Sequence, residues 1–275
     1  MRIAVTGADG FLARHLRVRL RALNPDDAVV SIGRGVLNDD RALNAALTET
    51  DAVVHLAGVN RGEDTEVEEG NVSVAEHLVA GLDRVGGKPR VVYGNSRQAG
   101  DASPYGRGKA RAAQILANWA ERAGAAFVDV VLPNVFGEGG RPNYNSVVAT
   151  FCHRLATGDG EPKIDVDREL DLLHAQDAAG VLIDLLGAGS VDCVVRPGGT
   201  PIRVSELLGR LEDLAATYRT GRFPDLSDPL TVRLFNTYRS YLYPHAFPMP
   251  LTAHRDNRGN FVETAQAVGG ESQSS

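Results

Sequence analysis

The sequence has little cysteine and no excess of basic residues. Among its 275 residues there are two cysteines, Cys152 and Cys193, and they lack the spacing of a metal-binding pair. We therefore expect reduced, mostly buried thiols rather than a disulfide. The formal net charge of -6 offers no cationic surface to a phosphate backbone, which argues against nucleic acid as a partner.

Long hydrophobic runs are also lacking. A membrane-spanning helix needs about 18 consecutive apolar residues, and the sequence has no such stretch. The segment from Met1 to Gly7 is interrupted by glycine too early to be the apolar core of a signal peptide. We predict a cytoplasmic protein with no membrane partner.

Short apolar segments alternate with helical patterns along the first half of the chain. Parallel strands require such crossover helices, so the alternation predicts an α/β fold with a doubly wound parallel sheet of the Rossmann type. The predicted strands are residues 3–5, 28–32, 52–56, 90–93 and 127–132.

Three regions are expected from the change of pattern along the chain. Residues 1–135 form the sheet domain, and residues 136–250 form a smaller C-terminal substrate-binding lobe, some of whose elements could interleave with the sheet. Residues 251–275 end in a polar, small-residue stretch from Gly269 that is expected to be disordered.

The turn after the first predicted strand has the features of a dinucleotide-binding loop. Gly7 permits a tight turn, Gly10 allows the backbone to approach a pyrophosphate, and Ala13 is small enough for close helix packing. The following helix would direct its free N–H groups toward the phosphates. The residues expected to contact the cofactor here are Thr6, Gly7, Asp9, Gly10, Phe11 and Leu12.

The end of the second predicted strand indicates which cofactor is used. A carboxylate at this place normally binds an unphosphorylated ribose. The segment Ser31–Arg34 has no carboxylate and supplies an arginine instead. Because a guanidinium pairs with a 2′-phosphate, Arg34 favours NADP(H), with Arg14 as a second candidate. A solvated surface arginine is the alternative.

A serine, a tyrosine and a lysine form the candidate catalytic set. Ser103 is a suitable N-cap and Pro104 suits the first helical position, so Tyr105 and Lys109 should lie one turn apart on one helix face. The lysine could stabilise the phenolate and hold a nicotinamide ribose. Ser96, just after a predicted strand, could hydrogen-bond a substrate carbonyl. An exposed helix pair is the alternative.

Together these motifs resemble the extended short-chain dehydrogenase/reductases of the NAD-dependent epimerase/dehydratase family. That family combines a Thr-Gly-x-x-Gly-Phe loop with a Tyr-x-x-x-Lys helix and a serine after a central strand, as at Thr6, Tyr105 and Ser96 here. The resemblance implies further cofactor contacts at Leu56, Ala57, Gly58, Asn71, Leu132 and Asn134.

Three segments resemble the capsular-polysaccharide reductases of this family, which reduce the 4-keto group of a UDP-2-acetamido-2,6-dideoxy-hexos-4-ulose. They are Gly58–Arg61, Leu132–Gly137 and Arg141–Cys152. The resemblance implies an NADPH-dependent reductase of a 4-keto nucleotide-activated deoxysugar. Arginine can bind a diphosphate and asparagine a uracil or acetamido group, although ordinary polar loop residues are the alternative. The expected substrate contacts are Asn60, Arg61, Asn134, Asn143, Asn145, Arg168 and His174.

The sequence departs from these relatives in two places. Gly94-Asn95-Ser96 replaces their consecutive serines, which leaves Ser96 as the candidate. The relatives continue into a zinc-binding cupin domain, and residues 251–262 resemble only its first strand. We expect no metal site, and a homodimer formed through the helices at residues 72–85 and 105–123.

Two other functions stay open at this point. An epimerase or 4,6-dehydratase would keep NAD tightly bound, although dehydratases place an acid beside the catalytic serine and Asn95-Ser96-Arg97 has none. A non-catalytic NADP(H)-sensing regulator is the alternative of another class, and such proteins usually lose the tyrosine or the lysine.

Overall fold

A computed structural model describes residues 1–187, 193–244, 246, 253–263 and 266–268. The chain divides into two compact units. The first unit comprises Met1–Pro133 and Ala175–Gly198, and the second comprises Asn134–His174 and Gly199–Ser275. The chain therefore returns to the first unit over Ala175–Gly198, within the region 136–250 whose elements were expected to be able to interleave with the sheet.

The first unit is built on a six-stranded sheet in the order β2-β1-β3-β4-β5-β8. All neighbouring strands are parallel, which confirms the predicted doubly wound α/β fold. The order reverses between β1 and β3, and ligands of such sheets bind beyond the carboxyl ends of the strands at that place. The strands are β1 (Arg2–Thr6), β2 (Ala28–Ile32), β3 (Ala52–His55), β4 (Arg90–Ser96), β5 (Phe127–Leu132) and β8 (Cys193–Val195).

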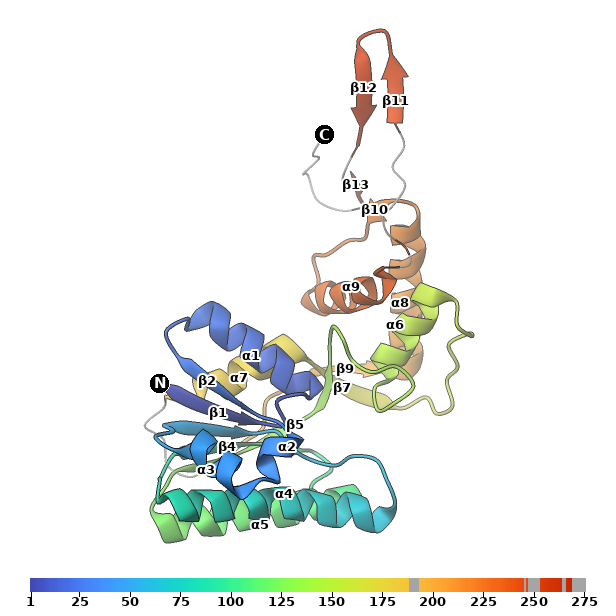
Figure 1. Cartoon of the computed structure of the whole chain (residues 1–275). Helices are drawn as coiled ribbons and strands as arrows, with labels where there is room; N and C mark the ends of the chain where they lie inside the picture. The colour runs from blue at the N-terminus through green and yellow to red at the C-terminus, as the bar shows by residue number, and fades with distance from the viewer. Residues whose placement is uncertain (188–192, 245, 247–252, 264–265, 269–275) are drawn as a thin grey trace. The chain divides into compact units, whose positions relative to one another are not determined.

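Helices cover both faces of this sheet (Figure 1). Helices α1 (Phe11–Leu23) and α7 (Ala175–Asp184) lie on one face. Helices α3 (Asp40–Leu47), α4 (Asp64–Val85) and α5 (Pro104–Ala123) lie on the other, after the short α2 (Arg34–Leu37). Because both faces are covered, the central strands are continuous apolar runs; all four residues of β3 are buried.

Within its described residues, the second unit contains a small sheet, three helices and two strand pairs. Strand β7 (Glu169–His174) lies between the parallel β6 (Asn134–Phe136) and the antiparallel β9 (Thr200–Arg203). The helices are α6 (Val147–Thr157), α8 (Val204–Arg219) and α9 (Pro229–Leu242). The strand pairs are β10 (Arg222–Phe223) with β13 (Gln266–Ala267), and β11 (Ala253–Asp256) with β12 (Gly259–Val262).

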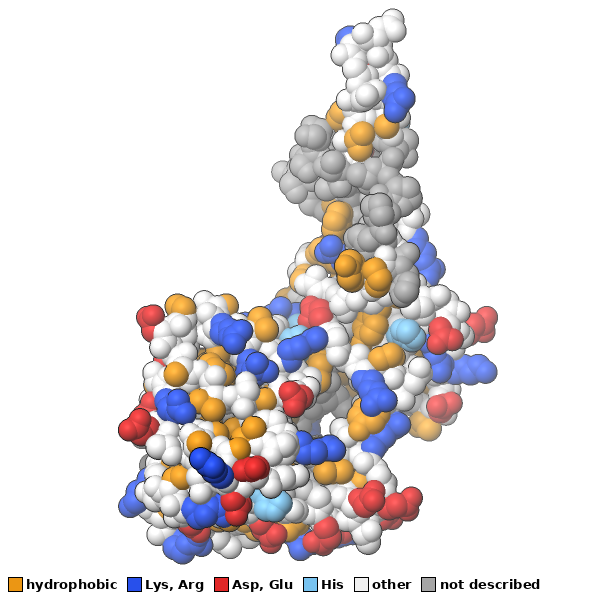
Figure 2. Space-filling view, viewed as in Figure 1, with side chains coloured by type: hydrophobic (Ala, Val, Ile, Leu, Met, Phe, Trp, Pro, Cys, Tyr) orange, Lys and Arg blue, Asp and Glu red, His pale blue; other side chains and the backbone are white. Residues whose placement is uncertain are grey.

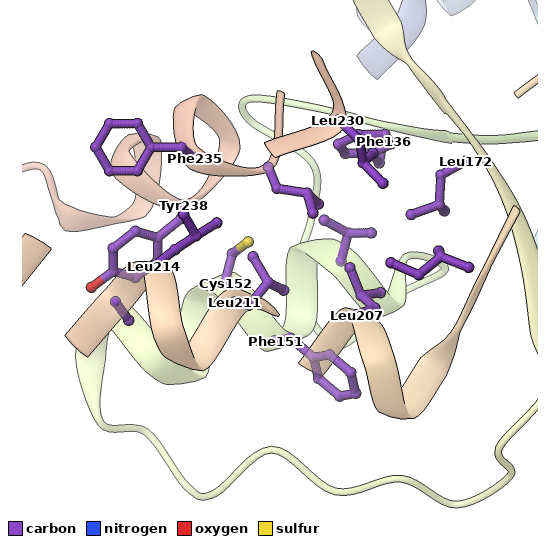
Figure 3. Close-up of a cluster of buried hydrophobic side chains, with 14 of the residues drawn as sticks. Phe136, Phe151, Cys152, Leu172, Leu207, Leu211, Leu214, Leu230, Phe235 and Tyr238 are labelled. Carbon is purple, nitrogen blue, oxygen red and sulfur yellow. The ribbon is translucent and has the colours of Figure 1, made fainter. Parts of the chain in front are cut away.

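The second unit has a hydrophobic core of its own. Leucines of α8, Cys152 of α6 and the aromatic rings of α9 point into it, as Figure 3 shows. Cys152 is fully buried, and burial raises the pKa of its thiol, so this cysteine is an inert core residue.

Basic and acidic side chains are interspersed over the visible face of the first unit (Figure 2). Residues 253–263 are mostly exposed in the β11–β12 hairpin, and the expected disordered stretch 269–275 lies outside the described residues. Among the described helices, none has the length and apolar character needed to cross a bilayer.

Candidate active site

The turn between β1 and α1 approaches the end of β3 so closely that it requires glycine. Gly7 has a φ of 64°, and a Cβ on it would lie 2.7 Å from the backbone nitrogen of Ala57. Gly10 donates its N–H to the carbonyl oxygen of Gly7 at 2.8 Å and is the N-cap of α1, where no side chain caps the helix. The first-turn N–H groups of α1, which include those of Phe11 and Leu12, are therefore uncapped by a side chain, as an anion site requires.

Thr6 holds the ends of β1 and β3 together. Its Oγ1 accepts the N–H groups of Leu56 at 3.1 Å and Ala57 at 3.2 Å, and lies 2.8 Å from Nδ1 of His55. Because two donors occupy its lone pairs, the hydroxyl proton goes to His55, which assigns the Nε2–H tautomer. Burial and, to a smaller extent, the charge of Lys109 lower the pKa of His55 to about 3, so the imidazole is neutral.

Asn71, on α4, supports the loop after β3. Its amide donates to the carbonyl oxygens of Val67 at 2.7 Å and Val59 at 2.5 Å, and its Oδ1 accepts the Val59 N–H at 3.3 Å. A Cβ on Gly58 would lie 2.8 Å from the same Oδ1. The side chain of Asn71 is thus committed to shaping the loop that carries the predicted contacts Leu56, Ala57 and Gly58.

The end of β2 carries an arginine and receives a carboxylate from the glycine loop. Arg34 is the exposed first residue of α2. The Asp9 carboxylate lies against Gly33, since a Cβ there would be 2.7 Å from Oδ2 of Asp9. Selection of a 2′-phosphate by Arg34 stays a prediction.

The predicted start of the tyrosine helix is confirmed. Ser103 caps α5 by accepting the Gly106 N–H at 3.0 Å, and Pro104 occupies the first turn. Gly108 allows α5 to lie close to α4, because a Cβ there would be 2.7 Å from the carbonyl oxygen of Glu68. Tyr105 and Lys109 therefore lie one turn apart near the carboxyl end of β4.

Tyr105 and Ser96 are brought together. Ser96 is the last residue of β4, and its hydroxyl accepts the Gln98 N–H at 3.2 Å and lies close enough to Tyr105 to lower the pKa of the phenol. Burial raises the pKa of Tyr105, and the nearby Ser96 hydroxyl partly offsets that effect. The phenol is thus protonated at neutral pH, as a proton donor must be.

Leu132, a predicted cofactor contact, is the buried last residue of β5. Its carbonyl oxygen accepts the Arg97 N–H at 3.1 Å.

Lys109 is a buried residue of α5, one helical turn after Tyr105. Its Nζ donates to the carbonyl oxygen of Gly94 at 2.7 Å and lies 4.1 Å from the centroid of the Tyr93 ring. Burial lowers the pKa of Lys109 to about 7, while the charge of Asp129 opposes the shift. A lysine titrating near neutrality between two strand ends is typical of a functional site.

Asn95 and Asp129 complete the site and were not predicted from the sequence. Asn95 donates to the Asp129 carboxylate at 3.1 Å and accepts the Ser96 N–H at 2.9 Å. The available signal was a carboxylate in the middle of the apolar run Phe127–Leu132, which an ordinary buried strand would not contain.

Two predicted substrate residues also belong to the first unit. Asn60 and Arg61 are exposed in the connection from β3 to α4. In the described residues, no group of three or more histidine, cysteine or acidic side chains is arranged to hold a metal ion.

The other predicted substrate residues belong to the second unit. Asn143 has a φ of 53° and accepts from Arg154 through Oδ1 at 3.3 Å. His174 is buried at the end of β7, with Nε2 at 3.2 Å from Glu138 and its ring edge-on to Phe136. Asn143 is exposed, as are Asn134 on β6, Asn145 before α6 and Arg168 before β7.

The first unit has the parts of a nicotinamide dinucleotide site. The Gly7 turn leaves room where a side chain would otherwise stand, and the α1 N-terminus suits a pyrophosphate. A buried lysine, a protonated tyrosine and a serine meet at the carboxyl ends of the central strands. This arrangement can transfer a proton to a carbonyl oxygen placed beside Tyr105.

The chain belongs to the NAD dependent epimerase/dehydratase family, whose model matches residues 3–191. It is thus an extended short-chain dehydrogenase/reductase. It is 30% identical, over 96% of its length and 71% of the relative's, to UDP-2-acetamido-2,6-beta-L-arabino-hexul-4-ose reductase of Pseudomonas aeruginosa.

Solved structures agree with this assignment. The capsular polysaccharide assembling protein CapF from Staphylococcus aureus is 33% identical, with a TM-score of 0.82 over 97% of this chain and 73% of that one. RMD from Pseudomonas aeruginosa, solved with NADPH, is 20% identical, with a TM-score of 0.75 over 88% of this chain and 98% of that one. The second likeness is one of fold alone.

Proposed function

We propose that this protein is an NADPH-dependent reductase of a 4-keto nucleotide-activated deoxysugar, resembling a UDP-2-acetamido-2,6-dideoxy-hexos-4-ulose. The observation that carries the proposal is the likeness to a 4-keto-sugar reductase along 96% of the chain, together with the retained Ser96, Tyr105 and Lys109. The product would serve polysaccharide or glycoside biosynthesis.

The residues divide the reaction between them. Bound NADPH supplies the hydride that reduces the carbonyl carbon. Tyr105 donates its phenolic proton to the carbonyl oxygen, and the Ser96 hydroxyl, which lies near the phenol, donates a hydrogen bond to the same oxygen. The Lys109 ammonium binds the ribose and stabilises the phenolate that forms. Thr6 and His55 keep the strand ends in place without contributing charge.

The substrate residues have separate roles in this proposal. Each of Arg61 and Arg168 is a candidate to bind the diphosphate, because guanidinium groups form paired hydrogen bonds with phosphate oxygens. Asn60, Asn134, Asn143 and Asn145 bind the uracil, acetamido or hydroxyl groups. His174 is engaged by Glu138, which supports a role in holding the lobe rather than a direct contact.

Subunit association and location belong to the proposal as well. Helices α4 and α5 pack side by side, and ion pairs between Arg107 and Glu68 and between Arg111 and Glu69 join them. We expect their outer face to form a homodimer and the enzyme to work in the cytoplasm.

The test is consumption of NADPH with a panel of UDP- and dTDP-4-keto sugars, alongside measurement of nucleotide released by denaturation. A reductase should oxidise one NADPH for each keto sugar that it reduces, and it should be purified largely without bound nucleotide. A full complement of tightly bound NAD would instead favour the epimerase or dehydratase. Cofactor binding without turnover on any keto sugar would favour a regulator.

A further inference from the structure

Asp129 stands where a buried strand would ordinarily have an apolar residue. It pairs in register with Tyr93 of the neighbouring β4, so both side chains face the helix layer that contains α5. Burial raises the pKa of Asp129, while Asn95, Lys109 and Arg196 lower it. Burying a carboxylate is costly unless nearby groups compensate its charge. The groups that contact Asp129 or act on its charge therefore indicate its role.

One oxygen of Asp129 is connected to the catalytic strand end. Oδ2 accepts from the Asn95 amide at 3.1 Å, and Oδ1 of Asn95 accepts the Ser96 N–H at 2.9 Å. Asn95 is only 5% exposed, so this bridge is shielded from water. Oδ1 of Asp129 is buried and has no hydrogen-bond partner in the described part of the chain. Its charge therefore acts through space.

Lys109 lies next to this charge, because its Nζ is 4.1 Å from the ring centroid of Tyr93, the residue that pairs in register with Asp129. The ionisable groups around the ammonium are His55 from β3, Tyr93 from β4, Tyr105 on its own helix and Asp129 from β5. Arg196, after β8, also acts on Asp129 through its charge. Among the described residues, Asp129 is the only carboxylate whose charge acts on Lys109. The two tyrosines and His55 are neutral, so they place no opposite charge beside the ammonium.

We propose that Asp129 is a positioning residue of the active site: through Asn95 it fixes the strand end that carries Ser96, and its negative charge keeps the buried Lys109 an ammonium. The catalytic consequence rests on the proposed function. The effect on Lys109 does not, and can be measured without substrate.

The chain allows this measurement because lysine occurs at only three positions, Lys88, Lys109 and Lys163. Replacing Lys88 and Lys163 by arginine leaves Lys109 as the only lysine, and its ε-carbon signal in an NMR titration then reports its ionisation. In that background, Asp129→Asn should lower the titration midpoint by roughly one unit, the size expected for removing a nearby opposite charge. Asp129→Thr, which suits a strand, should give the same shift if the asparagine variant folds poorly.

The matched control is Glu121→Gln, the same charge change at an exposed position of α5, twelve residues from Lys109 and about 18 Å along the helix. It should leave the midpoint unchanged. An unchanged or raised midpoint in both Asp129 variants would overturn the proposal, whatever reaction the enzyme catalyses.

The bridge through Asn95 is tested separately by kinetics. Asn95→Ala should leave the Lys109 midpoint close to that of the parent and lower kcat by about tenfold with little change in the KM for NADPH, because it releases Ser96 but not the lysine. An unchanged kcat would refute the bridge, and a loss confined to the KM for NADPH would place its effect at the cofactor instead.

Discussion

The Lys109 ammonium lies over the Tyr93 ring, with Nζ 4.1 Å from the ring centroid. Burying this charge is partly compensated by the ring, by the Gly94 carbonyl oxygen and by Asp129. The pKa of Lys109 is still lowered to about 7. The lysine is thus charged below neutrality and loses its charge as the pH rises, so cofactor binding that depends on this charge should depend on pH.

NADPH binding should weaken as the pH rises through about 7, because Lys109 then loses the proton with which it holds the ribose. Lys109→Met should bind NADPH more weakly than the parent at low pH, and the difference between the two should shrink as the pH rises. Fluorescence titration of NADPH at a series of pH values measures this difference. A constant difference across neutrality would place the titration elsewhere.

Tyr105→Phe should retain NADPH binding and lose most turnover. The ring keeps its packing, while loss of a general acid typically reduces rates by roughly 10² to 10⁴-fold. Binding by fluorescence and kcat by NADPH oxidation separate the two effects. Near-parental turnover would remove Tyr105 from the mechanism.

Arg34→Ala should weaken NADPH relative to NADH by at least about tenfold, since a charge-assisted hydrogen bond to the 2′-phosphate is lost. Arg41→Ala removes an exposed arginine from the neighbouring α3 and is the matched control. The ratio of kcat/KM for the two cofactors is the measurement. If Arg34→Ala leaves that ratio at the parental value, the phosphate is bound elsewhere, and Arg14 is tested next.

Thr6→Val should destabilise the first unit by about 1 to 3 kcal/mol, because the Leu56 and Ala57 N–H groups lose their acceptor in a buried place. Thr6→Ser keeps the hydroxyl and should retain most of that stability. Urea unfolding gives both values. Equal loss in the two variants would assign the effect to the threonine methyl group.

Local features were predictable from the sequence because neighbouring residues determine them. The Ser103 cap and the one-turn spacing of Tyr105 and Lys109 follow from helix geometry, and the Gly7 turn follows from its place between a strand and a helix. The parallel sheet followed from the alternation of strands and helices.

Long-range features were not predictable in the same way. Strand β8 has only three residues, and its pairing with β5 depends on the return of the chain through residues 175–198. Asn95 and Asp129 are 34 positions apart and meet only because β4 and β5 pair in one register. A one-residue slip would turn Asp129 to the opposite face.

Transfer of deuterium to the substrate from NADPH that is deuterated at both C4 positions of the nicotinamide tests the central claim most directly. With a UDP-2-acetamido-2,6-dideoxy-hexos-4-ulose, NMR of the product should show one deuterium at C4 for each NADPH oxidised, and Tyr105→Phe should form this product at a greatly reduced rate. A product that carries no deuterium at C4, or one that forms without net oxidation of NADPH, would contradict 4-keto reduction as the reaction of this enzyme.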